Sequence, residues 1–330
     1  MGGTYPHDFF HPHPASDAKR SRLLEKHTRR IHRFQIPQSA IRIPMTVLCF
    51  GEILWDALPA GLFPGGAPFN VAYHLHNLGA DARIVSAVGR DKLGDEVLRR
   101  IKGWGLSSDL IAINNGLPTG TVIAEVGDSG DAHYTITTSV AWDQIIAGDD
   151  AVQAAFSADA LVHGSLALRS TLNCASLDRL CAVMPDGAWR VFDVNLRPPH
   201  DDLELVRARA NGASLLKLNS GEAARLSSGE DGAAPGTEEA MALALADAHG
   251  CPRVCITCGS RGAGLLHEGA WHWEPGRAVD VVDTIGAGDA FLARLLVELL
   301  AGAKPAAEAL ASACRQGEWV ASKSGATPAY

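Results

Sequence analysis

From residue 46 onward, short apolar runs alternate with segments whose apolar residues repeat at helical spacing. The run TVLCFGEILW at 46–55 has the continuous apolar character of a buried strand. Residues 69–80 (FNVAYHLHNLGA) follow with helical spacing and stop at Gly79, a typical residue after a helix. A strand at 82–89 and a helix at 93–105 repeat this order. The alternation predicts parallel strands with crossover helices, an α/β sheet covered on both faces.

Residues 119–138 interrupt the alternation with two β-rich runs, TGTVIAEV and AHYTITT, separated by the polar turn GDSGD. This pattern predicts a β-hairpin, either packed as a sheet edge or standing out as a lid. The α/β pattern then resumes up to a final alanine-rich helix that is expected to reach Lys323. The polar stretch at 227–239 is typical of a solvated loop. The chain therefore favours one domain with a small β insertion.

Residues 1–44 differ from the rest in charge and in pattern. They hold eight of the 29 Lys and Arg residues and three of the 37 acidic residues, which leaves 21 basic and 34 acidic residues on the remainder. The segment has no sustained period and no apolar stretch of the signal-peptide kind, so it predicts a disordered basic extension. A targeting arm or a histidine-based metal site is the alternative. The acidic remainder does not favour nucleic-acid binding.

The composition predicts a cytoplasmic protein that does not interact with membranes. With 47% hydrophobic residues in 330, the chain has enough apolar side chains for a full core, and no run approaches the roughly 18 apolar residues of a membrane span. Seven cysteines, an odd number, are typical of reduced thiols. Cys251, Cys255 and Cys258 lie close together, which fits either a buried strand or a metal or redox site.

The stretch TIGAGDAF holds the strongest chemical signal. Gly286, Ala287 and Gly288 expose backbone amides directly before a strongly apolar helix, whose first N–H groups have no partners within the helix. Together with the helix dipole, these amides predict an anion site suited to phosphate. Asp289 at this place is either a helix cap or a catalytic base that accepts a hydroxyl proton. The preceding Gly-Ala-Gly favours the base, because a cap does not need it.

A second glycine cluster lies near the beginning of the regular pattern. Gly65 and Gly66 permit close approach of the backbone to a ligand, and Asn70 offers an amide from the first turn of a helix. A glycine turn with an Asn cap is the alternative. Asp56 is expected to end an apolar strand, where open α/β sheets bind ligands and a carboxylate can chelate sugar hydroxyls; it is otherwise a turn residue.

Two further stretches point to a nucleotide. Asn219 and Glu222 share one helical face and can hold Mg²⁺ through water, or they form a capping pair. The loop with Thr257, Gly259 and Gly262 can border a ribose and phosphates. The chain contains neither a Walker A motif nor a GxGxxG after its first strand, which weakens a dinucleotide-binding interpretation.

In order and separation, these elements resemble the signatures of the ribokinase-like (PfkB) carbohydrate kinases. GGAPFNVAYHLHNLGADARIVSAVG and DTIGAGDAF match the paired signatures, and FDVNLRPP, NSGE and TCGSRG fall between them as in the family. The resemblance covers residues 45–330, and GEILWD with GGAP looks most like bacterial fructokinases. It implies a three-layer α/β/α sandwich with a mostly parallel sheet. It also implies a small β lid from about 57–64 and 119–138, which in the family often forms a dimer contact.

The resemblance implies roles at matching positions. Asp289 would be the base, with the amides of 286–288 as the anion hole, and Asp56, Gly65, Gly66 and Asn70 would hold the sugar. Asn219 and Glu222 would organise Mg²⁺ and the ATP phosphates. The nucleotide site would take Thr257, Gly259 and Gly262, and Arg197 of the Asp193–Asn195–Arg197 element would lie near the phosphates. Asp283 matches a position that in some members helps to bind a monovalent cation such as K⁺.

Two departures bear on this resemblance. Arg294 stands where the second signature usually has a small residue, so its side chain must reach solvent or a partner. The lid stretch TTSVAWD does not follow a fructokinase pattern, which leaves ribose, 2-keto-3-deoxygluconate and a nucleoside such as adenosine as alternative substrates. A dinucleotide-dependent oxidoreductase and a catalytically silent sugar sensor are the competing classes. The missing fingerprint argues against the first, and Asp289 argues against the second.

Overall fold

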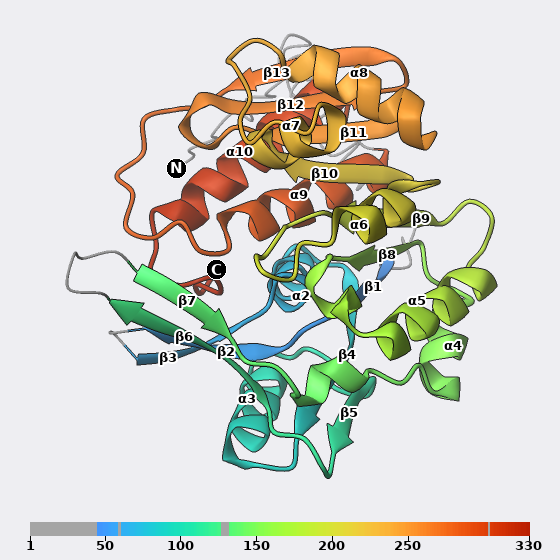
Figure 1. Ribbon diagram of the computed structural model, residues 1–330, viewed down its shortest axis with the longest axis vertical. Helices are drawn as coiled ribbons and strands as arrows, with labels where there is room; N and C mark the ends of the chain where they lie inside the picture. Colours follow the sequence, from blue (N-terminus) through green and yellow to red (C-terminus); the bar gives the residue numbers. More distant parts are fainter. Residues whose placement is uncertain (1–44, 59–60, 127–131, 303) are drawn as a thin grey trace, which may run out of the picture. The chain divides into compact units, whose positions relative to one another are not determined.

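The computed structural model describes residues 45–58, 61–126, 132–302 and 304–330, so the predicted extension of 1–44 lies outside the described residues. Within them a nine-stranded sheet forms the centre (Figure 1). Its strands are, in order from one edge, β13 (Ala270–Pro275), β12 (Gly262–His267), β11 (Arg253–Thr257), β10 (Leu215–Asn219), β9 (Trp189–Asp193), β8 (Ala160–His163), β1 (Thr46–Phe50), β4 (Asp81–Gly89) and β5 (Ile111–Asn114). The strands from β11 to β5 are parallel, and β12 and β13 are antiparallel. The sheet is therefore mostly parallel, as predicted.

Helices cover both faces of this sheet. One face packs against α2 (Ala67–Asn77), α3 (Lys92–Gly103), α9 (Ala287–Ala301) and α10 (Ala306–Ala321). The other packs against α4 (Asp149–Ala155), α5 (Thr171–Val183), α6 (Leu203–Ala210), α7 (Ser220–Ser227) and α8 (Glu238–His249). In β1, Val47 and Cys49 join the first core while Leu48 and Phe50 join the second, because side chains alternate across a strand. The three-layer sandwich is confirmed.

A second, smaller sheet has the strand order β3-β2-β6-β7. It consists of two antiparallel hairpins, β2 (Leu54–Leu58) with β3 (Gly61–Gly65) and β6 (Gly120–Val126) with β7 (Ala132–Ile136). Parallel pairing of β2 with β6 joins them. The insertion at 119–138 is thus one half of a separate sheet, and residues 54–65 supply the other half. Figure 1 shows this sheet beside the central one.

The apolar run at 46–55 is not one strand, as its pattern predicts, but two strands in different sheets. β1 ends at Phe50, and β2 begins at Leu54 in the smaller sheet. The chain turns at Gly51, where φ is 150° and a Cβ atom would lie 2.6 Å from the Pro68 ring. Asp56 consequently lies in the middle of β2, opposite Phe63, and not at the end of a central strand. The predicted strand-end position of Asp56 is therefore wrong.

Of the three neighbouring cysteines, Cys255 is part of a buried strand, whereas Cys251 precedes that strand and the half-buried Cys258 follows it. Cys255 lies within β11 and is fully buried, and burial raises the pKa of its thiol. Among the residues that the structure describes, no group of three or more His, Cys, Asp or Glu side chains is arranged to hold a metal ion. Nor does the described part of the chain contain a helix both long and apolar enough to cross a membrane. The last helix ends at Ala321, two residues before the predicted end.

Candidate active site

The two glycine clusters, far apart in the sequence, meet through a side-chain hydrogen bond. Asn70 Nδ2 donates to Asp289 Oδ2 over 2.8 Å, and both side chains are buried. Asn70 is placed by Gly66, which caps α2 at φ 110° and accepts the Asn70 N–H at 2.9 Å. A Cβ atom on Gly66 would collide with the Glu52 carbonyl oxygen, so only glycine fits there. The sequence therefore positions the Asn70 amide against Asp289.

Asp289 does not cap α9. Gly286 occupies the N-cap in the left-handed conformation, with φ 77°, and the helix has no side-chain capping bond. Asp289 is the third helical residue and accepts from Asn70 instead. The observed contacts thus argue against the capping alternative. Of the amides in the first turn, the Ala287 N–H donates to the Thr284 carbonyl at 3.3 Å, and the Gly288 N–H has no partner within the helix.

A buried ion pair lies beside this helix end. Lys217 Nζ is 2.9 and 3.0 Å from the two carboxylate oxygens of Asp193, and both residues are buried. The ammonium would be 3.2 Å from a Cβ atom on Gly288, so it lies against the glycine backbone. Burial lowers the pKa of Lys217, but the Asp193, Asp289 and Glu222 carboxylates outweigh burial, and the net pKa is raised. Lys217 thus brings a fixed positive charge to the predicted anion site.

Three carboxyl groups here have raised pKa values. Burial and then the Asp193 charge raise the pKa of Asp289 to about 6, against the opposing effects of Lys217, the Asn70 hydrogen bond and Arg197. Burial raises the pKa of Asp56 to about 6 and that of Glu52 to about 7, and the charge of Arg197 lowers both. A carboxylate with a pKa near 6 is ionised at neutral pH and more basic than a solvated one.

Asp56 and Gly65 lie against each other across the β2–β3 hairpin. A Cβ atom on Gly65 would collide with Asp56 Oδ2, so the missing side chain makes room for the carboxylate. The four predicted sugar-binding residues thus lie near one another: Asp56 contacts Gly65, and Gly66 accepts the Asn70 N–H. Asn70 Oδ1 and Glu52 Oε2 are buried with no hydrogen-bond partner, which leaves two acceptors for donors from outside the chain.

Asn219 and Glu222 form a capping box at the beginning of α7. Asn219 Oδ1 accepts the Glu222 N–H at 2.9 Å, and Glu222 Oε2 accepts the Asn219 N–H at 2.8 Å. The other oxygen of Glu222 accepts the Leu196 N–H at 2.8 Å, and burial raises the pKa of this carboxyl group. The observed geometry is that of the capping pair. A metal role for the two residues stays a prediction.

The nucleotide-directed loop borders a cavity of about 540 Å³. The cavity runs along the first turn of α9, and five predicted residues line it: Thr257, Gly259, Gly262, Ala287 and Gly288. The lining also includes apolar side chains, among them Val281, Phe291 and Cys314. Asn219, Glu222, Arg197 and Gly286 are not among the lining residues. A largely apolar cavity beside a helix N-terminus suits a nucleotide base with its phosphates directed to the amides.

The remaining predicted residues surround these groups. Asn195 has φ 43°, and the exposed Arg197 follows it at the same loop. Asp283 accepts the Ile285 N–H at 2.9 Å and the Gly325 N–H at 3.1 Å, which fixes the loop before Gly286. Arg294 pairs with Glu298 one turn along α9 at 2.5 Å and keeps 30% of its side chain exposed, as expected for a charged residue there.

Sequence reasoning missed several of these groups. Lys217 lies within an apolar strand, and Glu52 follows shortly after another. In the sequence, the only indication of a role for these two residues is that each is a single charged residue in an apolar run. The apolar wall of the cavity, from residues 276–281 and α10, gave no signal, because its side chains look like ordinary core residues.

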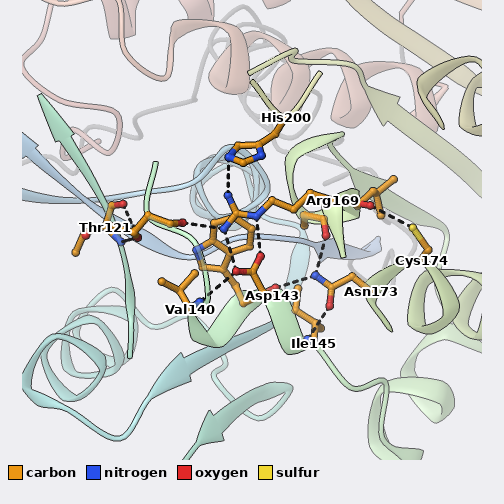
Figure 2. A network of polar contacts seen from close by, with 12 residues as sticks. Thr121, Val140, Asp143, Ile145, Arg169, Asn173, Cys174 and His200 are labelled. Atoms are coloured by element: carbon orange, nitrogen blue, oxygen red, sulfur yellow. Dashed lines mark hydrogen bonds and ion pairs between the residues drawn. The ribbon is translucent and has the colours of Figure 1, made fainter. Parts of the chain in front are cut away.

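Arg169 joins the smaller sheet to the loops beside the site (Figure 2). Its guanidinium donates to both Asp143 oxygens at 2.7 and 2.9 Å and to the Thr137 carbonyl at 2.8 Å, just after β7. It also stacks 4.0 Å over the Trp142 ring. His200 Nε2 lies 3.1 Å from Arg169 Nη1 and must accept, because arginine only donates. This network ties the end of the second hairpin to the loop after Arg197.

Replacing Arg169 by Leu is expected to lower the free energy of unfolding by about 2 kcal/mol, because it leaves the largely buried Asp143 carboxylate without its cation. Urea unfolding measures this change. The control is Arg179→Leu, which removes a pair with the 98% exposed Asp149 side chain and one hydrogen bond to the Ala147 carbonyl, leaves no buried charge unpaired, and should cost less than about 1 kcal/mol. Equal losses for the two variants would contradict the prediction.

Comparison with known proteins gives concordant matches. The model of the pfkB family carbohydrate kinases matches residues 51–330. The fructokinase of Klebsiella pneumoniae is 29% identical over 272 residues, 77% of this chain and 84% of that enzyme. The aminoimidazole riboside kinase of Salmonella typhimurium is 28% identical over 72% of this chain and 73% of its own length. The crystal structure of Vibrio cholerae fructokinase, bound to fructose, ADP and calcium, superposes with a TM-score of 0.72 at 24% identity, over 86% of this chain and 95% of that one.

Proposed function

Because this chain belongs to the pfkB family of carbohydrate kinases, we propose that it transfers the γ-phosphate of ATP to a primary hydroxyl of a sugar, with fructose as the preferred acceptor. One observation carries the proposal. The Asn70 amide holds the Asp289 carboxylate at the N-terminus of α9, beside a cavity of nucleotide size. The fructokinases among its relatives support the choice of sugar.

The sugar would bind against the β2–β3 hairpin and the beginning of α2. Asp56 would chelate sugar hydroxyls, and Asn70 would orient the reacting hydroxyl. Gly65 would make room for the Asp56 carboxylate, and Gly66 would set the position of α2 beside the sugar. The unpartnered Asn70 Oδ1 supports this, because a sugar hydroxyl would supply the donor that this buried acceptor lacks.

ATP would lie in the cavity, with its base against the apolar wall and its γ-phosphate at the α9 N-terminus. Asp289 accepts the proton of the hydroxyl, whose oxygen forms a bond to the γ-phosphorus as the bond to the β-phosphate oxygen breaks and ADP leaves. The amides of Gly286, Ala287 and Gly288 and the Lys217 ammonium stabilise the charge that develops on the phosphoryl oxygens. Arg197 would approach the phosphates from its exposed loop.

Mg²⁺ would be held through water by Asn219 and Glu222 and by the phosphates, the usual way in which proteins bind it with few carboxylates. Asn219 is exposed and its oxygen accepts one backbone N–H, whereas Glu222 is buried and both of its oxygens accept backbone N–H groups, so Asn219 fits this role better. When bound, the ion neutralises phosphate charge. Asp283, whose oxygens hold Ile285 and Gly325, would help to bind a monovalent cation such as K⁺.

The smaller sheet would act as a lid that closes over the sugar and excludes water, which otherwise would hydrolyse ATP. Leu62 and Ile123 on this sheet are 47% and 41% exposed, and burial of such residues between two copies would favour a homodimer through the lids. Light scattering in solution tests the dimer. We assign the protein to the cytoplasm.

The test of the proposed function is ADP release from ATP-Mg²⁺ with fructose, ribose, glucose, 2-keto-3-deoxygluconate, adenosine and aminoimidazole riboside. We expect the highest kcat/KM with fructose. A higher value with another acceptor would correct the substrate and keep the reaction. If ATP binds and no acceptor stimulates ADP release, the proposed function is wrong.

The raised pKa of Asp289 predicts an acid limit of activity. The base must be ionised to accept a proton, so kcat/KM is expected to fall about tenfold per pH unit below about pH 6. Asp56 has a raised pKa of about 6 as well, so the profile reports the carboxyl cluster as a whole. The measurement is kcat/KM for the sugar at saturating ATP between pH 5 and 8. A profile that stays flat down to pH 5 would contradict the prediction.

A further inference from the structure

The segment from Gly325 to Tyr330 packs directly behind the anion-hole loop. A Cβ atom on Gly286 would lie 2.6 Å from Cα of Ala326, so the two backbones are in contact. Asp283 bridges the same two segments through Ile285 and Gly325. In Figure 1 the end of the chain lies near the beginning of α9. Any shift of residues 325–330 would therefore displace the loop that presents the amides.

His74 fixes this segment from the other side. The imidazole is fully buried, and its Nε2 lies 2.9 Å from the Ala326 carbonyl oxygen. Its Nδ1 lies 2.9 Å from the Tyr330 hydroxyl oxygen. The neighbouring Tyr73 hydroxyl donates to the Pro328 carbonyl at 2.9 Å. Three hydrogen bonds from two adjacent residues of α2 thus hold this short segment.

The protons of this network can be assigned. A carbonyl oxygen only accepts, so His74 Nε2 carries a proton and donates to Ala326. Burial lowers the pKa of His74 to about 4, so the ring is neutral and Nδ1 accepts from the Tyr330 hydroxyl. The Tyr330 oxygen in turn accepts from Gln316 Nε2 at 2.9 Å, from α10. Every donor has an acceptor, which gives the segment one defined position.

The helix that carries His74, α2, also contacts the carboxylate proposed as the base. Asn70 and His74 are four residues apart on α2, which places them one above the other on one face. Asn70 contacts Asp289, and His74 contacts the segment behind Gly286. One helix, α2, therefore positions both parts of the α9 N-terminus: it contacts the base directly and the amide loop through Ala326.

We propose that His74 and Tyr330 are positioning residues for phosphoryl transfer, which hold residues 325–330 as a brace behind the amides of Gly286–Gly288. This inference rests on the proposed kinase function. Donors to a developing charge act only when they are held to within a fraction of an ångström, and a displacement of about 1 Å can cost about 100-fold in rate. Neither residue touches substrate; both act through Ala326.

Two variants test the brace. Tyr330→Phe removes only the hydroxyl from a half-exposed side chain, and we expect kcat to fall about tenfold while the KM values for sugar and ATP change less than about twofold. His74→Phe keeps a ring and loses both hydrogen bonds, so its kcat should fall further. Amide hydrogen exchange of residues 284–290, measured without substrate, should become faster in both variants.

The control is His249→Phe, which makes the same change at the end of α8, where His249 contacts Asn211 and has no bond to residues 325–330. It should leave kcat and the exchange of 284–290 unchanged. Tyr330→Phe with a lower melting temperature but wild-type kcat and exchange would overturn the proposal, since the contact would then only stabilise the fold. If the wild type releases no ADP with any acceptor, the proposed function fails, and the exchange measurement alone decides the brace.

Discussion

Replacing Asp289 by Asn is expected to lower sugar-dependent ADP formation about 1000-fold, within the range that a positioned general base contributes. Asn keeps the size of the side chain and an oxygen that can accept from Asn70, so the contact between the two glycine clusters should survive. What it loses is the ability to take the hydroxyl proton. The loss should therefore appear in kcat, with sugar KM and ATP affinity within a few-fold of the wild type.

The matched control is Asp247→Asn, an identical change at an exposed position of α8 that should leave all three constants unaltered. Steady-state kinetics and calorimetric ATP binding on the three proteins separate catalysis from binding. An Asp289→Asn enzyme that turns over as fast as the wild type would show that the carboxylate only holds Asn70. The assignment of the base would then be abandoned.

The glycine clusters could be predicted from sequence because their signal is local. Gly66 and Gly286 adopt φ values of 110° and 77°, which favour glycine, and each stands directly before an apolar helix. The prediction of a phosphate site at the α9 N-terminus follows from these features alone. The resemblance of the two motifs to known signatures added the roles of single residues, which local chemistry left open.

Contacts between segments far apart in the chain could not be predicted from the sequence. His74 binds Ala326, 252 residues away, and in the sequence it is only one polar residue in an apolar helix. Asn219 and Glu222 have a spacing that suits both a capping pair and a metal site. In the structure the second Glu222 oxygen accepts the N–H of Leu196, a residue of another loop, so both carboxylate oxygens are engaged as in a structural cap. Likewise, the run at 46–55 is apolar in both halves, so nothing in it marks the change of sheet.

Replacing Lys217 by Met is expected to lower the free energy of unfolding by about 3–5 kcal/mol, because it leaves the Asp193 carboxylate buried without its cation. For a domain whose total stability is about 5–15 kcal/mol, this is a large share. Lys217 also lowers the pKa of Asp289, so its loss should move the acid limit of the residual kcat/KM to higher pH. Urea unfolding and the pH profile measure the two effects.

The double variant Lys217→Met/Asp193→Leu separates the two contributions of this pair. It removes both charges and leaves apolar side chains, so its stability should return to within about 1–2 kcal/mol of the wild type. Since Asp193 raises the pKa of Asp289 and Lys217 lowers it, removing both should also return the acid limit toward its original position. The double variant is nonetheless expected to stay slow, because in the proposed mechanism the ammonium beside Gly288 helps to stabilise phosphoryl charge. A double variant no more stable than Lys217→Met would mean that an uncompensated charge is not the cause. One with wild-type kcat would remove Lys217 from the mechanism.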